Sequence, residues 1–232
     1  MSSLSTIIGL CFALGGPALL ARFGNHFSSN LESLVSKLLQ QIALAMLFVI
    51  ILGIVVFGEQ QSLSSIGLHS LRWQSILWGL IFAGFLIFIY SPLLVWSMTK
   101  LGLAGFEKGL AKLESLPFWY LALAVVIGGV VEEVLYRGYA TERLSLLTGS
   151  CWIGCALSLT AFGLAHVPLW GWVPASTTVL SGYLLTLFYW STGDLLTAIV
   201  AHIATDFAGI IIPKVMSTKW ARQMLNNAVA AD

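Results

Sequence analysis

Ionisable residues interrupt the apolar stretches of this sequence at three places. At the first, Glu132 and Glu133 follow directly on an apolar run from Phe118 to Val131, and Arg137 comes four residues after Glu133. A charge at the centre of a bilayer costs at least roughly 2.5–3.5 kcal/mol, so charged residues there usually serve a function. On a helix Glu133 and Arg137 share a face and can pair, whereas Glu132 points about 100° away. Glu132 is therefore available for acid–base chemistry or metal binding.

Two later apolar stretches contribute histidines. His166 follows Phe162 by one helical turn, and Asp206 follows His202 by four residues. A single histidine within a membrane is more often a hydrogen-bonding partner between helices than a catalyst. Three separate helices that each carry such groups are harder to explain in this way, because polar groups in hydrocarbon must face one another. We therefore expect one water-accessible cavity lined by four side chains: Glu132, His166, His202 and Asp206.

The composition predicts which elements carry these residues. The 232 residues are 58% hydrophobic and only 9% charged, with a mean hydropathy of +0.92, which is too apolar for the surface of a soluble globule. The formal net charge of +1 argues against a nucleic-acid-binding protein. All three cysteines lie in apolar segments, so a secreted disulfide framework is not indicated. The sequence predicts an all-α, polytopic bundle of membrane helices.

A helix needs about 20 apolar residues to cross a bilayer. By this length the sequence contains about seven spans (six to eight), at residues 6–21, 40–57, 76–98, 118–136, 151–167, 174–191 and 194–213. The excess of Lys and Arg in the connections on one side places the N-terminus outside and the C-terminus inside. With these boundaries Glu132 and His202 lie at similar depth near the outer half, while His166 lies nearer the inner side. Either a boundary differs, or the fifth span is tilted or re-entrant.

Three motifs occur in a fixed order on successive apolar segments: EExxxR from Glu132, FxxxH from Phe162 and HxxxD from His202. In this order they resemble the CPBP family of intramembrane proteases, which includes CAAX prenyl endopeptidases and bacteriocin-processing or self-immunity proteins. The resemblance covers roughly the last four spans. The sequence then divides into three parts: variable membrane helices with interfacial connectors over 1–116, a catalytic helix core over 117–213 that carries the resemblance, and a short polar tail over 214–232.

The resemblance implies an endopeptidase that cuts a membrane-associated peptide or protein, at the plasma membrane of a bacterium. Glu132 would activate the water, His166 would help to hold it, and His202 would face the oxyanion. Asp206 stands where the CAAX branch has Asn, so its role would be to orient His202 or to bind a metal. Three further residues would surround the catalytic side chains and hold them in place: Glu133, Arg137 and Phe162.

The same residues leave alternatives open. The site could work without a cofactor, or with tetrahedral Zn²⁺ held by Glu132, His166, His202 and Asp206. A non-catalytic immunity or binding protein that captures a membrane-active peptide could carry the same motifs. A proton-coupled transporter would also bury Glu, His and Asp, but the first three spans hold few polar residues for its substrate. In each case the lipid bilayer is a partner and nucleic acid is not.

Overall fold

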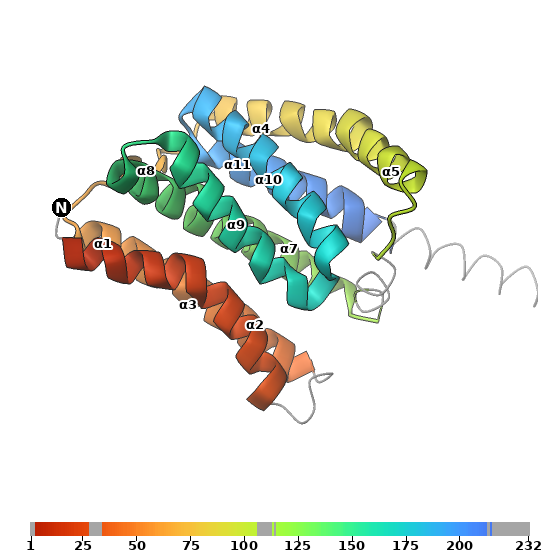
Figure 1. Cartoon of the computed structure of the whole chain (residues 1–232), viewed down its shortest axis with the longest axis horizontal. Helices are drawn as coiled ribbons and strands as arrows, with labels where there is room; N and C mark the ends of the chain where they lie inside the picture. Colours follow the sequence, from red (N-terminus) through yellow and green to blue (C-terminus); the bar gives the residue numbers. More distant parts are fainter. Residues whose placement is uncertain (1–2, 28–33, 106–112, 114, 213, 215–232) are drawn as a thin grey trace, which may run out of the picture.

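A computed structural model describes residues 3–27, 34–105, 113, 115–212 and 214, and every regular element in this part of the chain is a helix (Figure 1). Several helices continue through a π-helical turn into the next segment. The elements are α1 (Ser3–Leu10) with Cys11–Gly15 and α2 (Gly16–Phe27); α3 (Leu34–Gly53) with Ile54–Gly58; the 3-10 turn Leu63–Ile66; α4 (Trp73–Phe85) with Leu86–Tyr90 and α5 (Ser91–Lys100); α7 (Phe118–Glu132) with Glu133–Thr141 and α8 (Glu142–Thr148); α9 (Cys151–Trp170); α10 (Trp172–Thr192); and α11 (Leu195–Asp206) with Phe207–Ile211.

The helices confirm the prediction of an all-α, polytopic membrane bundle. Five of the described helices are long and apolar enough to cross a membrane: Leu4–Arg22, Leu34–Gly58, Trp73–Lys100, Phe118–Thr148 and Cys151–Trp170. A shorter apolar helix spans Leu195–Ile211, and α10 has 21 residues. In Figure 1, α1 begins and α8 ends at one end of the bundle, whereas α2 and α5 end at the opposite end. Successive crossings therefore run in alternating directions.

The helix Phe118–Thr148 is the centre of the bundle. In its most apolar window 44% of the residues are buried, against 17–33% for the other four long helices. The prediction ended this span at residue 136, which is wrong, because the helix continues to Thr148 through a π-helical segment whose nine residues are all buried. The polar residues of that segment lower its hydropathy, but most of them have partners inside the protein; Thr141, for example, donates to the Tyr136 carbonyl.

A second buried ion pair attaches the N-terminal helices to this central helix. Arg143 Nη2 lies 2.8 Å from Glu59 Oε2, and both side chains are at most 2% exposed. Glu59 Oε1 also accepts hydrogen bonds from Tyr139 Oη at 2.8 Å and from Thr6 Oγ1 at 2.9 Å. The predicted spans 118–136 and 151–167 leave Arg143 in the connection between them, so this network was not expected. We refer to Glu59, Arg143, Tyr139 and Thr6 below as the Glu59 network.

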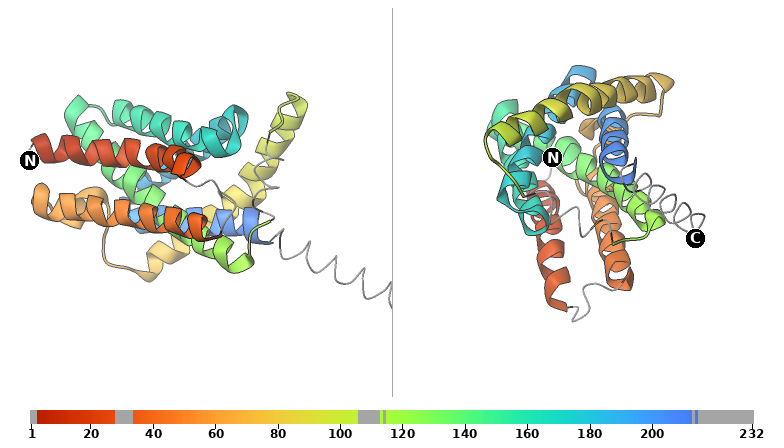
Figure 2. Two further views of the ribbon diagram at one scale, coloured as in Figure 1. Left: turned by 90° about the horizontal axis from the view of Figure 1, so that it is seen from below. Right: turned by 90° about the vertical axis from the view of Figure 1, so that its right-hand side faces the viewer.

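The N-terminal helices form a hairpin on one side of the remaining bundle (Figure 2). Here α2 packs against α3 and α9, and α3 packs against the central α7. The π-helical turn Cys11–Gly15 joins α1 and α2 into one continuous helix that runs through Gly15, Gly16 and Pro17. Of the predicted polar tail over 214–232, only Lys214 belongs to the described residues.

Candidate active site

The continuation of the central helix to Thr148 brings Glu132 and His166 together. Gly149, in the left-handed conformation with a φ of +70°, ends α8, and the chain then reverses into α9. Glu132 and His166 lie 17 residues before and after this glycine, so they face each other across the helical hairpin. The distance from Glu132 Oε2 to His166 Nε2 is 3.9 Å. The predicted difference in depth between these residues resulted from the misplaced end of the fourth span.

A close contact between α7 and α11 places His202 at the same point. A methyl group added at Gly129 would lie 2.5 Å from Ile203 Cγ1, so only a glycine lets α11 approach this closely. As a result, His202 Nε2 also lies 3.9 Å from Glu132 Oε2. Gly129, three residues before Glu132, therefore permits the close contact between the two helices. Gly128, on the neighbouring face, lines the cavity instead.

Glu133 connects the two other ionisable residues of the site. Its Oε1 accepts a hydrogen bond from Arg137 Nη1 at 2.9 Å, which confirms the predicted pair four residues apart. The same oxygen lies 2.8 Å from His202 Nδ1, and since a carboxylate only accepts, Nδ1 donates. Both Glu133 and Arg137 are fully buried, with exposed fractions of 0% and 1%. The bond to His202 could not be predicted, since it depends on how α11 packs against α7.

The Phe162 ring packs against both Arg137 and His166. Its ring centroid lies 4.2 Å from the Arg137 guanidinium carbon and 4.5 Å from the His166 ring. His166 Nδ1 lies 2.8 Å from the Phe162 carbonyl oxygen, to which it must donate. In a neutral imidazole the other nitrogen then carries the lone pair. His166 therefore presents an acceptor, Nε2, to Glu132.

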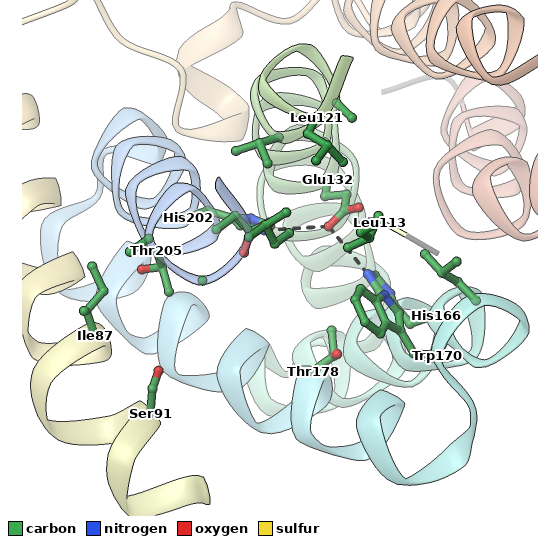
Figure 3. Close-up of a pocket in the computed structure, with 18 of the residues that line it drawn as sticks. Ile87, Ser91, Leu113, Leu121, Glu132, His166, Trp170, Thr178, His202 and Thr205 are labelled. Atoms are coloured by element: carbon green, nitrogen blue, oxygen red, sulfur yellow. Dashed lines mark ion pairs between the residues drawn. The ribbon is translucent and has the colours of Figure 1, made fainter. Parts of the chain in front are cut away.

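Figure 3 shows Glu132 between His166 and His202. The three side chains line one cavity of about 620 Å³. Glu132 is 25% exposed, His166 18% and His202 11%, so all three are accessible. Asp206 is the most exposed of the four at 39%, and its Oδ2 lies 3.4 Å from His202 Nε2. The four residues predicted to share a cavity all line it.

A second cavity, of about 350 Å³, meets the first at Glu132 and His166. It lies between the N-terminal hairpin and the core, and is lined by residues of α2, α3, α7 and α9. Three residues on one face of α7 line both cavities: Ala124, Gly128 and Glu132. From Glu132 the first cavity extends to Leu121 and Trp170, near the beginning of α7 and the end of α9. Both cavities thus run from Glu132 toward the same end of the bundle.

The four candidate ligands are not arranged as a zinc site. In a tetrahedral site with bonds of about 2.0–2.1 Å, neighbouring ligand atoms lie roughly 3.4 Å apart, whereas Glu132 Oε2 is 3.9 Å from both histidine nitrogens. Within the described residues no group of three or more His, Cys, Asp or Glu side chains could hold a metal ion. The arrangement therefore does not fit the predicted zinc alternative, and we derive no step through a metal.

Comparison with known proteins finds one family model that matches part of the chain. Residues 114–208, which include α7 to α11, match the family model described as Type II CAAX prenyl endopeptidase Rce1-like. No curated protein and no solved structure matches the chain. The matched region contains all three motifs that sequence analysis associated with the CPBP family. The protein is an integral membrane protein, and the match over residues 114–208 supports its assignment to the CPBP family of CAAX-type intramembrane proteases.

Proposed function

We propose that this protein is a membrane-embedded endopeptidase in which Glu132 activates the hydrolytic water. The observation that carries the proposal is the position of Glu132 Oε2, 3.9 Å from the Nε2 atoms of both His166 and His202, at the inner end of a cavity large enough for a peptide. These atoms come from three helices, and α7, α9 and α11 have little reason to bury such groups together for stability alone.

The separation of Glu132 and His166 suits a bridging water molecule. A distance of 3.9 Å exceeds the 2.7–3.2 Å of a direct hydrogen bond, and polar groups at such a distance are often joined by water. Both Glu132 Oε2 and His166 Nε2 are acceptors, so a water between them donates one hydrogen to each. Its lone pairs then point into the cavity, toward a substrate carbonyl carbon.

Hydrolysis follows from this arrangement. The water oxygen attacks the carbonyl carbon while Glu132 takes its proton, and Glu132 then returns that proton to the leaving amine. General acid–base catalysis of this kind typically accelerates a reaction by about 10²–10⁴-fold. The carboxylate ends the cycle in its starting form, so Glu132 acts first as base and then as acid.

His202 would stabilise the oxyanion. Glu133 holds its Nδ1–H at 2.8 Å, which turns Nε2 toward Glu132 and Asp206. With a proton on each ring nitrogen, His202 donates from Nε2 to the carbonyl oxygen as negative charge develops there. Removing one such donor typically costs about 10²–10³ in kcat. Asp206 accepts from Nε2 at 3.4 Å before substrate binds and so orients the ring.

We infer that the substrate is a peptide or protein at the inner surface of a bacterial plasma membrane. Both cavities run toward the end of the bundle where α5 ends at Lys100 and Lys214 lies. Cytoplasmic connections are enriched in Lys and Arg, so this end faces the cytoplasm and the N-terminus lies outside. The substrate therefore reaches Glu132 from the cytoplasmic side.

A comparison of wild type with Glu132→Gln tests this proposal without knowledge of the substrate. Both proteins are expressed at matched levels in a host that lacks its own copy, and peptide termini in the membrane and the medium are identified by mass spectrometry. We expect a specific set of new termini with wild type only. Glu142→Gln is the matched control, because Glu142 lies on the same long helix but accepts from Tyr189, away from the cavity.

Two results would contradict the proposal. One is an identical set of termini from wild type and Glu132→Gln. The other is rescue of a loss-of-function phenotype by Glu132→Gln, which would favour a protein that captures a peptide without cutting it. Loss of the termini in the Glu142→Gln control would point to misfolding instead of catalysis.

A further inference from the structure

A third cavity, of about 220 Å³, lies behind His202, between α5, α10 and α11. We call it the side pocket. It shares six lining residues with the main cavity: Ser91, Phe162, Thr178, His202, Thr205 and Asp206. Among the residues found only in the side pocket are Tyr90, Arg137, Thr177 and Ser181. Glu132 and His166 do not line it, so the pocket adjoins the reaction centre without containing it.

The walls of the side pocket are rich in hydroxyl groups whose hydrogens are already used. Ser91 Oγ donates to the Leu86 carbonyl at 2.8 Å, and Thr205 Oγ1 donates to the Ala201 carbonyl at 2.8 Å. Ser181 lies between two partners, the Thr177 carbonyl at 3.1 Å and the Tyr90 hydroxyl at 3.1 Å. Because each hydroxyl oxygen keeps lone pairs, these walls offer acceptors to whatever occupies the pocket.

Arg137 supplies the opposite kind of group. Its side chain is 1% exposed, and its Nε and Nη2 atoms have no hydrogen-bond partner among the described residues. A buried donor left without a partner costs about 1–3 kcal/mol, and more when it is charged. A ligand that accepts from a guanidinium and also donates to hydroxyl oxygens would satisfy both walls. A water molecule can donate two hydrogen bonds and accept two, so it satisfies both walls. Each water occupies about 30 Å³ in the liquid, so several molecules fit in the side pocket.

We propose that the side pocket stores water for the reaction and supplies it past His202 while the substrate fills the main cavity. This inference rests on the proposed function, because only hydrolysis consumes water. Each cut adds the elements of one water across a peptide bond, so the molecule between Glu132 and His166 must be replaced in every cycle. His202 and Asp206 line both cavities, which makes their side chains the passage between store and site.

The first test measures water in the side pocket directly, by hydroxyl-radical footprinting of the full-length protein in lipid nanodiscs. Radicals form from water, so a side chain beside bound water is labelled even when it is remote from bulk solvent. Tyr90 lines the pocket, and Phe88, two residues away and 79% exposed on the outer surface, faces lipid. After correction for intrinsic reactivity, we expect Tyr90 to be labelled several-fold more than Phe88.

Two variants relate this water to the reaction. Ser181→Leu fills the side pocket, while Ser191→Leu makes the same change on the exposed face of the same helix, where Ser191 donates only to Phe188. Thr177→Val removes a hydroxyl at nearly constant volume and serves if the larger change disturbs folding. We expect Ser181→Leu and Thr177→Val to reduce both the Tyr90 label and the rate at which new termini appear several-fold. Ser191→Leu should change neither.

The outcomes separate the two proposals. Equal labelling of Tyr90 and Phe88 in wild type would overturn the water store and favour an apolar occupant such as an acyl chain. A label that falls in Ser181→Leu without any change in cleavage would overturn the supply role. If wild type produces no new termini at all, the proposed function fails and the supply role with it, whereas footprinting still decides whether the pocket holds water.

Discussion

Replacing Glu133 with Gln tests whether this residue positions His202. Glu133 Oε1 accepts from both Arg137 Nη1 at 2.9 Å and His202 Nδ1 at 2.8 Å, and the side chain is fully buried. Glutamine has nearly the same shape, but it removes the negative charge that both donors share. Arg137 then remains as a buried cation without its counter-charge, and the His202 ring loses its charged anchor.

The expected magnitudes follow from these contacts. Removing one partner of a buried ion pair typically costs about 3–5 kcal/mol of stability. For a chain of this size, that corresponds to a fall of roughly 6–20 °C in the unfolding midpoint. A hydrogen bond to a charged group contributes about 1.5–3 kcal/mol, so loss of the His202 anchor should slow cleavage about ten- to hundredfold.

Glu59→Gln is a matched control within the same molecule. Glu59 also forms a buried pair, with Arg143 Nη2 at 2.8 Å, and its side chain is fully buried. The Glu59 network does not contact the histidines of the site. Both variants should therefore lose stability to a similar extent, whereas only Glu133→Gln should lose activity per folded molecule. Thermal unfolding in detergent and the rate at which new termini appear measure the two effects separately.

A double variant completes the test. Glu133→Gln combined with Arg137→Met removes both charges, and replacing a buried pair by groups without charge is often neutral for stability. We expect the double variant to recover most of the unfolding midpoint but not the activity, since His202 still lacks its carboxylate partner. If activity returned together with stability, Glu133 would serve only to neutralise Arg137, and the positioning role would be refuted.

Three further changes test separate parts of the site. Gly182→Ala should lower both stability and activity, because its added methyl group would lie 2.4 Å from Arg137 Nη2. Gly84→Ala in α4, where an added methyl group meets nothing within 4 Å, is the control for loss of a glycine in unfolding and cleavage assays. Asp206→Asn should keep activity within a few-fold of wild type, since the amide oxygen can still accept from His202 Nε2, whereas Asp206→Ala should lose more; equal losses in a cleavage assay would contradict an orienting role. Chelation with a membrane-permeant phenanthroline should leave the cleavage rate unchanged. If cleavage were lost and added Zn²⁺ restored it, the result would support the zinc alternative.

The sequence was sufficient for the fold class and for the four ionisable residues that line the main cavity. Membrane crossings leave long apolar runs, so a polytopic helical bundle follows from composition and segment length. Ionisable side chains are so costly in hydrocarbon that Glu132, His166, His202 and Asp206 had to share an accessible cavity, and they do. The pairing of Glu133 with Arg137 was equally predictable, since it depends only on helical spacing.

Only the tertiary structure decided how these residues meet and what lies behind them. Hydropathy ended the central helix at residue 136, because polar side chains that are buried among partners resemble a loop in sequence. The bond from Glu133 to His202, the Glu59 network and the side pocket all join residues far apart in the chain. Such contacts depend on how closely helices pack, as at Gly129 against Ile203, and helical periodicity within one segment carries no information about its neighbour.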